Sequence, residues 1–570
     1  MLKILVLFLI SYLYLYRSFN SFKTPYVTGD GFEYILMTEA FYNHLSPKIE
    51  ASDIKSFKEK FVKHHNWDVF YKKEFVDNLI VYFETSKRDF REGKGGFYVN
   101  RNKNFYSYHF FFYSLINLPS YAISQHYGPL RSFYFTNAIL VILTTIVLLF
   151  FTPFHFYKQI LAALCFCFGT CYWYLGWQHT EVFSASLVTI ALVLFFNKKH
   201  YWSLFVMGLV CLQTQPLVLL VGFIGLATLI EKGFNKKNIL IIAALSAIAF
   251  IPPLFYLINY NSTNLIKDAG FLDTKYITLN RVTGFYFDVN QGLILAIPLI
   301  LLIYLPLLII ELKNIRQKKS AFDFSLLLPL CIIAISITIS TMGNWNHGMA
   351  IVNRYVSWIS CIVMIHVFYL ADKLNILKSF SLFHYFFFTQ AITILYHQKF
   401  NQYDWSQNQH TPLAKWILNH HPTWYSPDPY IFALRTQPYT NLVEDNSPFV
   451  FFDEEKKVKK VLANRNTLDR LVDFGYRKED IAEMKKTVKF NYDWGYLDGF
   501  ETSFNSDQIY KVIHERKVQA AYGKILSSKD WTAQIHEKAK KWNMTFEQVI
   551  RLDAEYIVEL DEKAQNEIGK

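Results

Sequence analysis

Residues 131–151 read RSFYFTNAILVILTTIVLLFF, an apolar run long enough to cross a bilayer as a single helix. The hydrocarbon core of a membrane is about 30 Å thick, so a spanning helix needs roughly 20 mainly apolar residues. The whole chain has a matching composition, with 52% hydrophobic, 18% aromatic and 18% charged residues among 570. It is more apolar and more aromatic than an average soluble chain. The sequence therefore predicts an integral membrane protein.

Hydropathy along the chain predicts an all-α polytopic membrane protein with about eleven transmembrane helices. The first segment is interpreted as a membrane anchor and not as a signal peptide. Tyr12, Tyr14 and Tyr16 stand where a cleavage site would need small residues. The eleven predicted segments are 2–18, 131–151, 159–177, 180–196, 201–214, 216–230, 239–260, 290–311, 321–340, 355–371 and 379–397.

Basic residues in the short connections give a predicted orientation. They gather in alternate connections, which the positive-inside rule assigns to the cytoplasm. With eleven spans, the N-terminus is then cytoplasmic, whereas the loop 17–130 and everything after residue 397 are extracytoplasmic. These residues account in part for the net charge of +12, so we do not read that charge as nucleic-acid binding. They are Lys198, Lys199, Lys232, Lys236, Lys237, Lys313, Arg316, Lys318, Lys319, Lys373 and Lys378.

The first predicted external loop begins with an acidic motif, Thr28-Gly29-Asp30-Gly31-Phe32-Glu33-Tyr34. Asp30 and Glu33 are three apart and so fall on one face of a helix, and the glycines beside Asp30 let the backbone approach a ligand. This pattern favours an acid site at the membrane surface. A helix N-terminus is an equally good interpretation, with Thr28 or Asp30 as the cap and Glu33 as its partner in a capping box. The sequence leaves both open.

The rest of this loop has two parts. Residues 45–101 are mixed and charged and predict short helices with turns at 93–96. Residues 104–123 are an aromatic run that contains Tyr106 and His109. We interpret this run as an interfacial or re-entrant helix, because aromatic rings with polar tips favour the headgroup level. The alternative is a twelfth span, which would invert the pattern of positive charge after it.

Further polar residues cluster on the same predicted face. Ionisable groups at the edge of a bilayer are costly and mark sites or pathways by default. The structural alternatives are a helix-capping turn for His179 and Glu181, and snorkelling to headgroup phosphate for Arg354. For Asp288 a helix cap is the favoured interpretation. The six cysteines lie in apolar segments and are interpreted as small buried hydrophobic residues, not as zinc ligands. The polar clusters contain Trp177, His179, Glu181, Asp288, Asn346, His347 and Arg354.

Together these motifs resemble the GT-C superfamily of membrane glycosyltransferases, and in particular its uncharacterised bacterial members. The resemblance covers roughly residues 1–397. In better-known members the first-loop acids are often adjacent or one apart, whereas Asp30 and Glu33 are three apart. The motifs that carry the resemblance are Gly29-Asp30-Gly31-Phe32-Glu33-Tyr34, Tyr106-Ser107-Tyr108-His109, His179-Thr180-Glu181-Val182-Phe183, Asp288-Val289-Asn290-Gln291-Gly292 and Asn346-His347-Gly348 to Arg354-Tyr355.

The resemblance implies transfer of a sugar from a polyprenyl-phosphate donor to a lipid, glycan or protein acceptor. The reaction would take place at the outer face of the bacterial cytoplasmic membrane. A carboxylate must take the proton of the acceptor hydroxyl, and we expect Asp30 to do so, with Glu33 as the second choice. The leaving lipid phosphate gains negative charge, which Arg354 would stabilise with help from His347.

The resemblance also implies residues that hold the sugar or the acceptor. It leaves the cofactor open: Asp30, His179 and Glu181 offer carboxylate and imidazole ligands, which allow a divalent cation without demanding one. The residues expected to contact the sugar or acceptor are Tyr106, His109, Trp177, His179, Glu181 and Asn346.

Two other classes of function stay open. A transporter or lipid flippase for glycolipid precursors would need charged groups at mid-membrane depth. A non-catalytic assembly component would have no need of Asp30.

Residues 398–570 are charged and cysteine-free and predict a small, mainly helical extracytoplasmic domain. Within it, Thr545-Phe546-Glu547-Gln548 predicts a capping box that opens a helix. The apolar face of that helix is predicted to be Val549, Ile550, Leu552, Ile557 and Val558.

Overall fold

The computed structural model describes residues 1–20, 27, 29–70, 72–319, 321–343, 345, 352–376, 385, 388–393, 395, 409–436, 448–455 and 457–568. The chain is mostly helical and divides into two compact units, which we call unit 1 (Met1–Ala414) and unit 2 (Lys415–Lys570). The division falls somewhat later than the boundary predicted after residue 397. Each unit is described by itself.

Six helical stretches of unit 1 are long and apolar enough to cross a membrane, and each matches a predicted segment. They support the prediction of a helical membrane protein, whereas eleven spans are not found among the described residues. The six are α1 (Leu2–Asn20), η3 with α6 (Pro129–Arg131, Ser132–Phe150), η5 with α11 (Gln215–Leu217, Val218–Lys232), α12 to α13 (Lys236–Ala247, η6 Ile248–Phe250, Ile251–Tyr260), α17 (Pro298–Arg316) and α19 (Arg354–Lys373).

Four of the other predicted spans differ from a single long helix, and the fifth, 379–397, lies mostly outside the described residues. Segment 159–177 is broken by a π-helical turn. The remaining three are apolar helices too short to meet the length of a span. The elements concerned are α7 (Phe156–Phe166), η4 (Cys167–Cys171), α8 (Tyr172–Tyr174), α9 (Glu181–Phe196), α10 (His200–Cys211), η8 (Phe324–Leu327) and α18 (Leu328–Ile339).

The break after α10 has a clear physical cause. The Gln213 side chain turns toward another segment, where it accepts a hydrogen bond from the backbone N–H of Tyr113 at 3.0 Å and donates to the carbonyl of Phe110 at 2.7 Å. Pro216 follows, and it has no N–H to continue a helix. The polar groups that shorten this apolar segment therefore tie it to the first loop.

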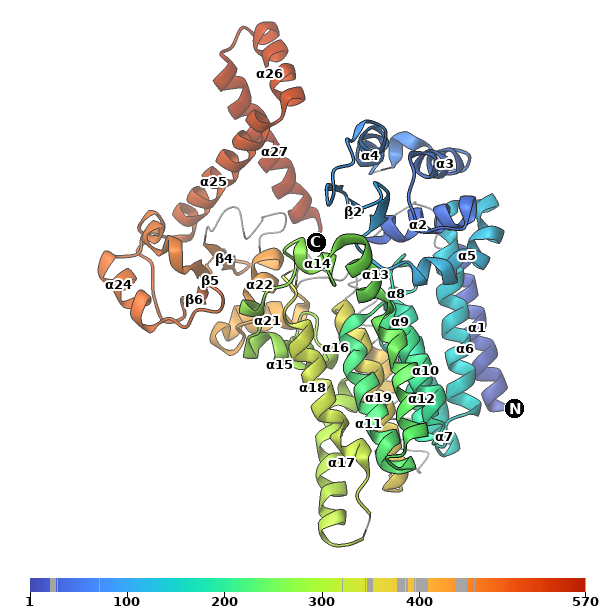
Figure 1. Cartoon of the computed structure of the whole chain (residues 1–570). Coiled ribbons are helices and arrows are strands. Elements are labelled where there is room, and N and C mark those ends of the chain that lie inside the picture. Colours follow the sequence, from blue (N-terminus) through green and yellow to red (C-terminus); the bar gives the residue numbers. More distant parts are fainter. Residues whose placement is uncertain are drawn as a thin grey trace. The chain divides into compact units, whose positions relative to one another are not determined.

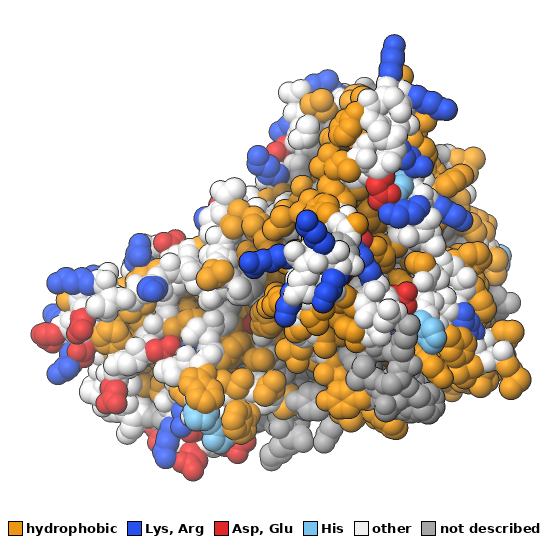
Figure 2. All heavy atoms as spheres, turned by 90° about the horizontal axis from the view of Figure 1, so that it is seen from below, with side chains coloured by type: hydrophobic (Ala, Val, Ile, Leu, Met, Phe, Trp, Pro, Cys, Tyr) orange, Lys and Arg blue, Asp and Glu red, His pale blue; other side chains and the backbone are white. Residues whose placement is uncertain are grey.

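The apolar helices form a bundle in which α9 packs against α6, α10 and α19 (Figure 1). At one end of the bundle, which we call the basic end, the connections of several helices meet through polar contacts. Seen from below, the molecule shows Lys and Arg side chains gathered on a largely hydrophobic face (Figure 2). The contacts at the basic end include Lys198–Glu231, Asn197–Phe151, Lys158–Asp372 and Lys373–Glu311.

The first loop forms a compact layer of short helices and a three-stranded antiparallel sheet in the order β1-β2-β3, and its helix α5 packs against α6. The predicted turn at 93–96 is the β1–β2 hairpin, and the predicted short helices are present. The elements are α2 (Gly31–His44), α3 (Ala51–Val62), η1 (Trp67–Val69), α4 (Lys73–Thr85), β1 (Gly93–Lys94), β2 (Phe97–Val99), β3 (Phe105–Ser107), α5 (Phe112–Ser124) and η2 (Gln125–Tyr127).

The aromatic run 104–123 becomes β3 and most of α5. With 13 residues, α5 is about 20 Å long, which is too short to cross a bilayer core. It packs between α2 and α6 and buries polar side chains such as Asn117, which donates to Ser132 and accepts from Thr136. This run therefore supplies a packed helix and not a twelfth span.

Unit 2 combines helices with a three-stranded antiparallel sheet in the order β4-β5-β6. The predicted capping box is confirmed: Gln548 accepts from the N–H of Thr545, whose hydroxyl accepts from the N–H of Gln548. Val549, Ile550 and Val558 are buried as predicted, but Leu552 is 43% exposed. The elements are α22 (Pro429–Thr436), β4 (Phe449–Phe452), β5 (Val458–Asn464), η11 (Arg465–Phe474), α24 (Lys478–Thr487), β6 (Trp494–Tyr496), α25 (Ser506–Ser527), α26 (Lys529–Trp542) and α27 (Phe546–Ile568).

The sheet of unit 2 was not predicted, because its strands are short and one, Phe449–Phe452, is apolar at every position and shows no alternation. All six cysteines of the chain are free and five are buried, as expected. The remaining elements of the chain are α14 (Leu265–Asp268), η7 (Thr274–Tyr276), α15 (Leu279–Phe287), α16 (Leu293–Ala296), α21 (Pro412–His420) and η10 (Pro422–Trp424).

Candidate functional site

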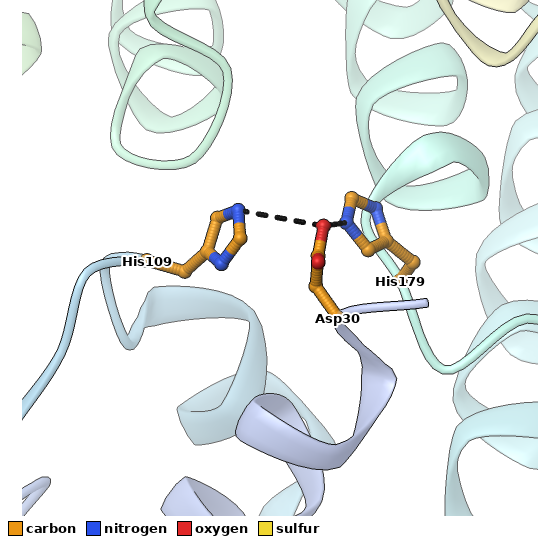
Figure 3. A group of neighbouring side chains, drawn as sticks. All are labelled: Asp30, His109 and His179. Atoms are coloured by element: carbon orange, nitrogen blue, oxygen red, sulfur yellow. Dashed lines mark ion pairs between the residues drawn. The ribbon is translucent and has the colours of Figure 1, made fainter. Parts of the chain in front are cut away.

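A cluster of ionisable side chains lies at the end of the bundle opposite the basic end, where α9 and α19 begin. Asp30 and Glu33 come from the start of α2, and His109 from the turn between β3 and α5. His179 lies just before α9, and Arg354 is the first residue of α19. Figure 3 shows the carboxylate of Asp30 between the two imidazole rings. Four segments that are far apart in the sequence therefore meet at one place.

Asp30 is the centre of the cluster. Its Oδ2 lies 3.4 Å from His179 Nε2, 3.5 Å from Arg354 Nη1 and 3.9 Å from His109 Nε2. Its Oδ1 accepts a hydrogen bond of 3.4 Å from the Tyr108 hydroxyl. Burial raises the pKa of this carboxyl, but the hydrogen bond with His179 and the charges of His109 and Arg354 outweigh burial and lower the pKa well below its usual value. Asp30 is therefore ionised at neutral pH.

The capping-box interpretation of the acidic motif is wrong. Asp30 does occupy the N-cap position of α2, but its side chain makes no capping hydrogen bond. The side chain of Glu33 turns away from the helix terminus instead and accepts from the Ser107 hydroxyl. Both carboxylates are thus committed to partners from other segments.

Glu33 contacts His109 at Nδ1, the ring nitrogen opposite the one that faces Asp30. Its Oε2 lies 3.0 Å from His109 Nδ1, and only 6% of its side chain is exposed. Burial raises the pKa of Glu33 to about 7, against the opposing influence of His109. Gly96 makes this position available: its φ is +87°, and a Cβ atom there would lie 2.3 Å from Glu33 Oε1. The hairpin turn must therefore be glycine for Glu33 to reach His109.

Glu181 supports His179 in the same way. Its Oε2 lies 2.8 Å from His179 Nδ1, and its other oxygen has no hydrogen-bond partner among the described residues. Burial lowers the pKa of His179, but the charge of Glu181 and the bonds to Asp30 and Glu181 raise it overall to about 9. Gly31 brings this segment close to α2, since a Cβ there would lie 3.1 Å from the Cβ of Gln178.

Arg354 points into the protein and is only 8% exposed, which is not the placement of a snorkelling side chain. Asn353 caps α19 by accepting from the N–H of Tyr355 at 2.9 Å. The guanidinium donates to the Tyr355 hydroxyl at 2.9 Å, and its Nη1 lies 3.4 Å from His179 Nε2. Its Nε has no partner among the described residues. The residue thus has donor capacity left for a ligand.

The other predicted site residues have different positions. Trp177 lies beside the cluster, with its ring edge-on to His179 and the ring centroids 6.0 Å apart. Tyr106 does not lie beside the cluster. Successive strand residues face opposite sides, so Ser107 faces Glu33 while Tyr106 packs edge-on against Phe255. The prediction that Tyr106 lines this site is wrong. Asn346 and His347 lie outside the described residues.

Three residues of the cluster were not predicted as site residues. Ser107 contacts Glu33, and Tyr108 contacts Asp30. Both belong to the motif Tyr106-Ser107-Tyr108-His109, from which only Tyr106 and His109 were predicted as site residues. The ring of Tyr34 packs against both imidazoles, with centroids 5.4 Å from His109 and 5.2 Å from His179. The period of two along the strand is the signal that would have placed Ser107 and His109 on one side.

One group of side chains in the described part of the chain has the composition and spacing of a metal site. Oδ2 of Asp30 and one ring nitrogen each of His109 and His179 all lie within 4.8 Å of one another. The set differs from the predicted one, because Glu181 lies behind His179 and does not face the other ligands. His109 takes its place.

Comparisons with known proteins give no family for this chain: no protein-family model, no curated protein and no solved structure matches it.

Proposed function

We propose that the protein transfers a sugar from a polyprenyl-phosphate donor to an acceptor hydroxyl. The observation that supports this function best is the meeting of an ionised carboxylate, Asp30, with a buried guanidinium, Arg354, at 3.5 Å. A transfer of this kind needs a proton acceptor and a phosphate-binding cation within the length of one sugar.

The chemistry divides between these two groups. As the acceptor oxygen forms its bond to the anomeric carbon, its proton passes to Asp30, and the bond from the anomeric carbon to the phosphate oxygen breaks with its electron pair on the phosphate. Arg354 holds that phosphate through its guanidinium, whose Nε has no partner among the described residues and is free to donate to an oxyanion. A phosphate at this place also draws the guanidinium away from Asp30, which makes the carboxylate a stronger base.

Several neighbours suit a carbohydrate at this place. Asp30 keeps 29% of its side chain exposed, so a hydroxyl can reach it. The rings of Trp177 and Tyr108 lie beside the ionisable groups and offer flat apolar faces to a pyranose. Glu33 and Glu181 fix the imidazoles and do not face the acceptor. In this scheme Asp30 is the base and Glu33 is a positioning residue.

The charge distribution of unit 1 gives the proposed location. The cluster and the basic end lie at opposite ends of α9 and α19. By the positive-inside rule the basic end faces the cytoplasm, so the cluster faces the extracytoplasmic side of a bacterial cytoplasmic membrane. The donor's isoprenoid tail would lie along apolar helices, and its phosphate at the level of Arg354. The acceptor is a lipid, a glycan or a protein on that side.

The test is capture of the donor. The protein and two variants are purified in nanodiscs formed directly from the membrane, and bound lipids are identified by mass spectrometry. We expect Asp30→Asn to retain a polyprenyl-phosphate sugar, because binding is kept while turnover is lost, and Arg354→Gln to lose it.

Arg281→Gln is the matched control, because Arg281 is also buried but donates to the carbonyls of Ser340 and Met342 outside the cluster. It should retain the lipid. Absence of any lipid-linked sugar from Asp30→Asn, or its equal retention by Arg354→Gln, contradicts the proposal. Movement of an intact glycolipid between leaflets without sugar transfer would identify a flippase instead.

A further inference from the structure

The hydrogen bonds behind the two imidazoles leave both Nε2 atoms in front, facing one carboxylate. His109 and His179 each direct Nδ1 to a carboxylate, Glu33 at 3.0 Å and Glu181 at 2.8 Å. Nε2 of each ring faces Asp30 Oδ2, at 3.9 Å for His109 and 3.4 Å for His179. When an ion takes the place of the Nε2 proton, two imidazole lone pairs and one carboxylate oxygen meet at this point.

With a proton on it, Nε2 of His179 has two opposed neighbours. An Nε2–H group there would satisfy Asp30, but it would also face Arg354 Nη1, which is 3.4 Å away and can only donate. The atom thus has an acceptor-only group and a donor-only group at nearly equal distances. A cation between Nε2 and Oδ2, with the guanidinium displaced toward an anion, satisfies all three groups.

We propose that Asp30 Oδ2, His109 Nε2 and His179 Nε2 bind one divalent transition-metal ion of the Zn²⁺ type, with a fourth position left open to a phosphate oxygen of the donor. In so far as the ion serves catalysis, this inference rests on the proposed function; the binding of the ion rests on the geometry alone.

The separations fit a tetrahedral ion. With ligand bonds of about 2.0 to 2.1 Å, adjacent ligand atoms of a tetrahedral zinc site lie about 3.3 Å apart. The two separations from Asp30 are 3.4 Å and 3.9 Å, and all three ligand atoms lie within 4.8 Å of one another. Closing the set requires the two imidazole nitrogens to approach each other by at most about 1.5 Å. Three protein ligands with one open position are the pattern of a catalytic zinc site.

The donor set and its support select the kind of ion. Two imidazoles and one carboxylate suit zinc and neighbouring transition metals, whereas Mg²⁺ prefers oxygen ligands and keeps several waters. The carboxylates of Glu33 and Glu181 on the Nδ1 atoms match the arrangement by which metal-binding histidines are oriented and made more basic. Both imidazoles have this support, which a chance approach of side chains would not require.

The surrounding charges also favour a cation. Asp30 lies in front of the two imidazoles and Glu33 and Glu181 lie behind them. The fixed positive groups that act on these carboxylates are Arg354 and Lys72. The ion and Arg354 together would hold the phosphate from two sides.

The test is metal binding by the intact protein without donor lipid. The protein is purified in detergent, stripped with a chelator and titrated with Zn²⁺ and, separately, with Co²⁺, whose visible spectrum reports a site with nitrogen ligands. We expect one equivalent to bind. His179→Gln and His109→Gln should abolish the Co²⁺ spectrum, and Glu181→Gln should weaken affinity about 10- to 100-fold.

His44→Gln is the matched control, because His44 also pairs with a buried carboxylate, Asp53 at 3.1 Å, but lies outside the cluster. It should bind the ion as the unaltered protein does. Binding that survives both imidazole substitutions, or no binding of Zn²⁺ or Co²⁺ by the unaltered protein, overturns the inference. Equal competition by Mg²⁺ overturns it too.

The two proposals fail independently. Sugar transfer that continues in a protein shown to bind no metal refutes the metal site and leaves the proposed function intact. Stoichiometric, imidazole-dependent binding in a protein without sugar transfer refutes the function and leaves the metal site intact.

Discussion

Replacing Asp30 by Asn tests the proposed base with almost no change in side-chain volume. A positioned general base contributes about 10²- to 10⁴-fold in rate. At 1.36 kcal/mol for each factor of ten, that is about 2.7 to 5.4 kcal/mol of activation free energy. We therefore expect sugar transfer by Asp30→Asn to fall at least about 100-fold, because the amide cannot take the proton of the acceptor.

The same substitution has a smaller effect on stability. Removing one partner of a buried ion pair costs about 3 to 5 kcal/mol. Asp30 faces Arg354 and His179, but 29% of its side chain is exposed, so solvent screens part of the interaction. After this discount we expect a loss of about 1 to 2 kcal/mol in the free energy of unfolding. The protein should remain folded, with a slightly lower melting temperature.

Glu39→Gln is the control that separates the two effects. Glu39 lies on the same helix, its side chain is fully buried, and it accepts from Lys60, Ser56 and Tyr121, all outside the cluster. Because it is better buried than Asp30, its substitution should cost more stability, about 3 to 5 kcal/mol. The turnover of each folded molecule should be unchanged.

The assay follows release of polyprenyl phosphate from a panel of polyprenyl-phosphate-linked hexoses. The enzyme is held in nanodiscs with a membrane lipid extract as the source of acceptor, and rates are normalised to folded protein. Asp30→Asn should lose activity with little loss of stability, whereas Glu39→Gln should lose stability with no loss of activity per folded molecule. Unchanged turnover in Asp30→Asn, or equal losses in the two variants, would refute the assignment of the base.

Three further predictions concern other parts of the structure. Gly96→Ala should lower the melting temperature more than Gly270→Ala in the same scan, because both glycines have positive φ but only at Gly96 would a Cβ meet Glu33. In metal-free buffer, the free energy of unfolding should fall as pH rises from about 4.5 to about 7. The reason is that the raised pKa of Glu33 lets the folded state hold the proton more tightly than the unfolded state. Glu33→Gln should therefore flatten this fall. A flat profile in the unaltered protein would contradict the buried position of Glu33. In unit 2, Lys460→Met should lower the free energy of unfolding of that unit by about 3 kcal/mol, as measured by denaturant titration. The substitution leaves Asp498 without the ammonium group that lies 2.9 Å from both of its carboxylate oxygens. A change below about 1 kcal/mol would argue against that ion pair.

Composition and long apolar runs were enough to predict the membrane helices of unit 1 that carry no polar interruption. They overestimated the number of spans where tertiary contacts shorten a helix. The segment that ends near Gln213 is an example, since its amide binds the backbone of the first loop at Phe110 and Tyr113. Such a contact joins residues about 100 positions apart, and hydropathy within a single segment carries no sign of it.

The candidate site was predictable in part for a similar reason. Asp30, His179 and Arg354 each stand at the start of a helix on one predicted side of the membrane, so their meeting follows from topology. The choice between Glu181 and His109 as a metal ligand does not follow from topology, because it depends on the direction in which each side chain points. The error at Tyr106 has the same origin, since one step along a strand reverses the direction of a side chain.

The most direct test of the account is a structure of Asp30→Asn bound to the polyprenyl-phosphate sugar that copurifies with it. The account predicts the donor phosphate within hydrogen-bonding distance of the Arg354 guanidinium, and the anomeric carbon between that phosphate and the side-chain amide that the substitution introduces at position 30. A phosphate bound near Lys198 and Lys373 at the basic end, or a sugar shielded from position 30 by packed side chains, would contradict it.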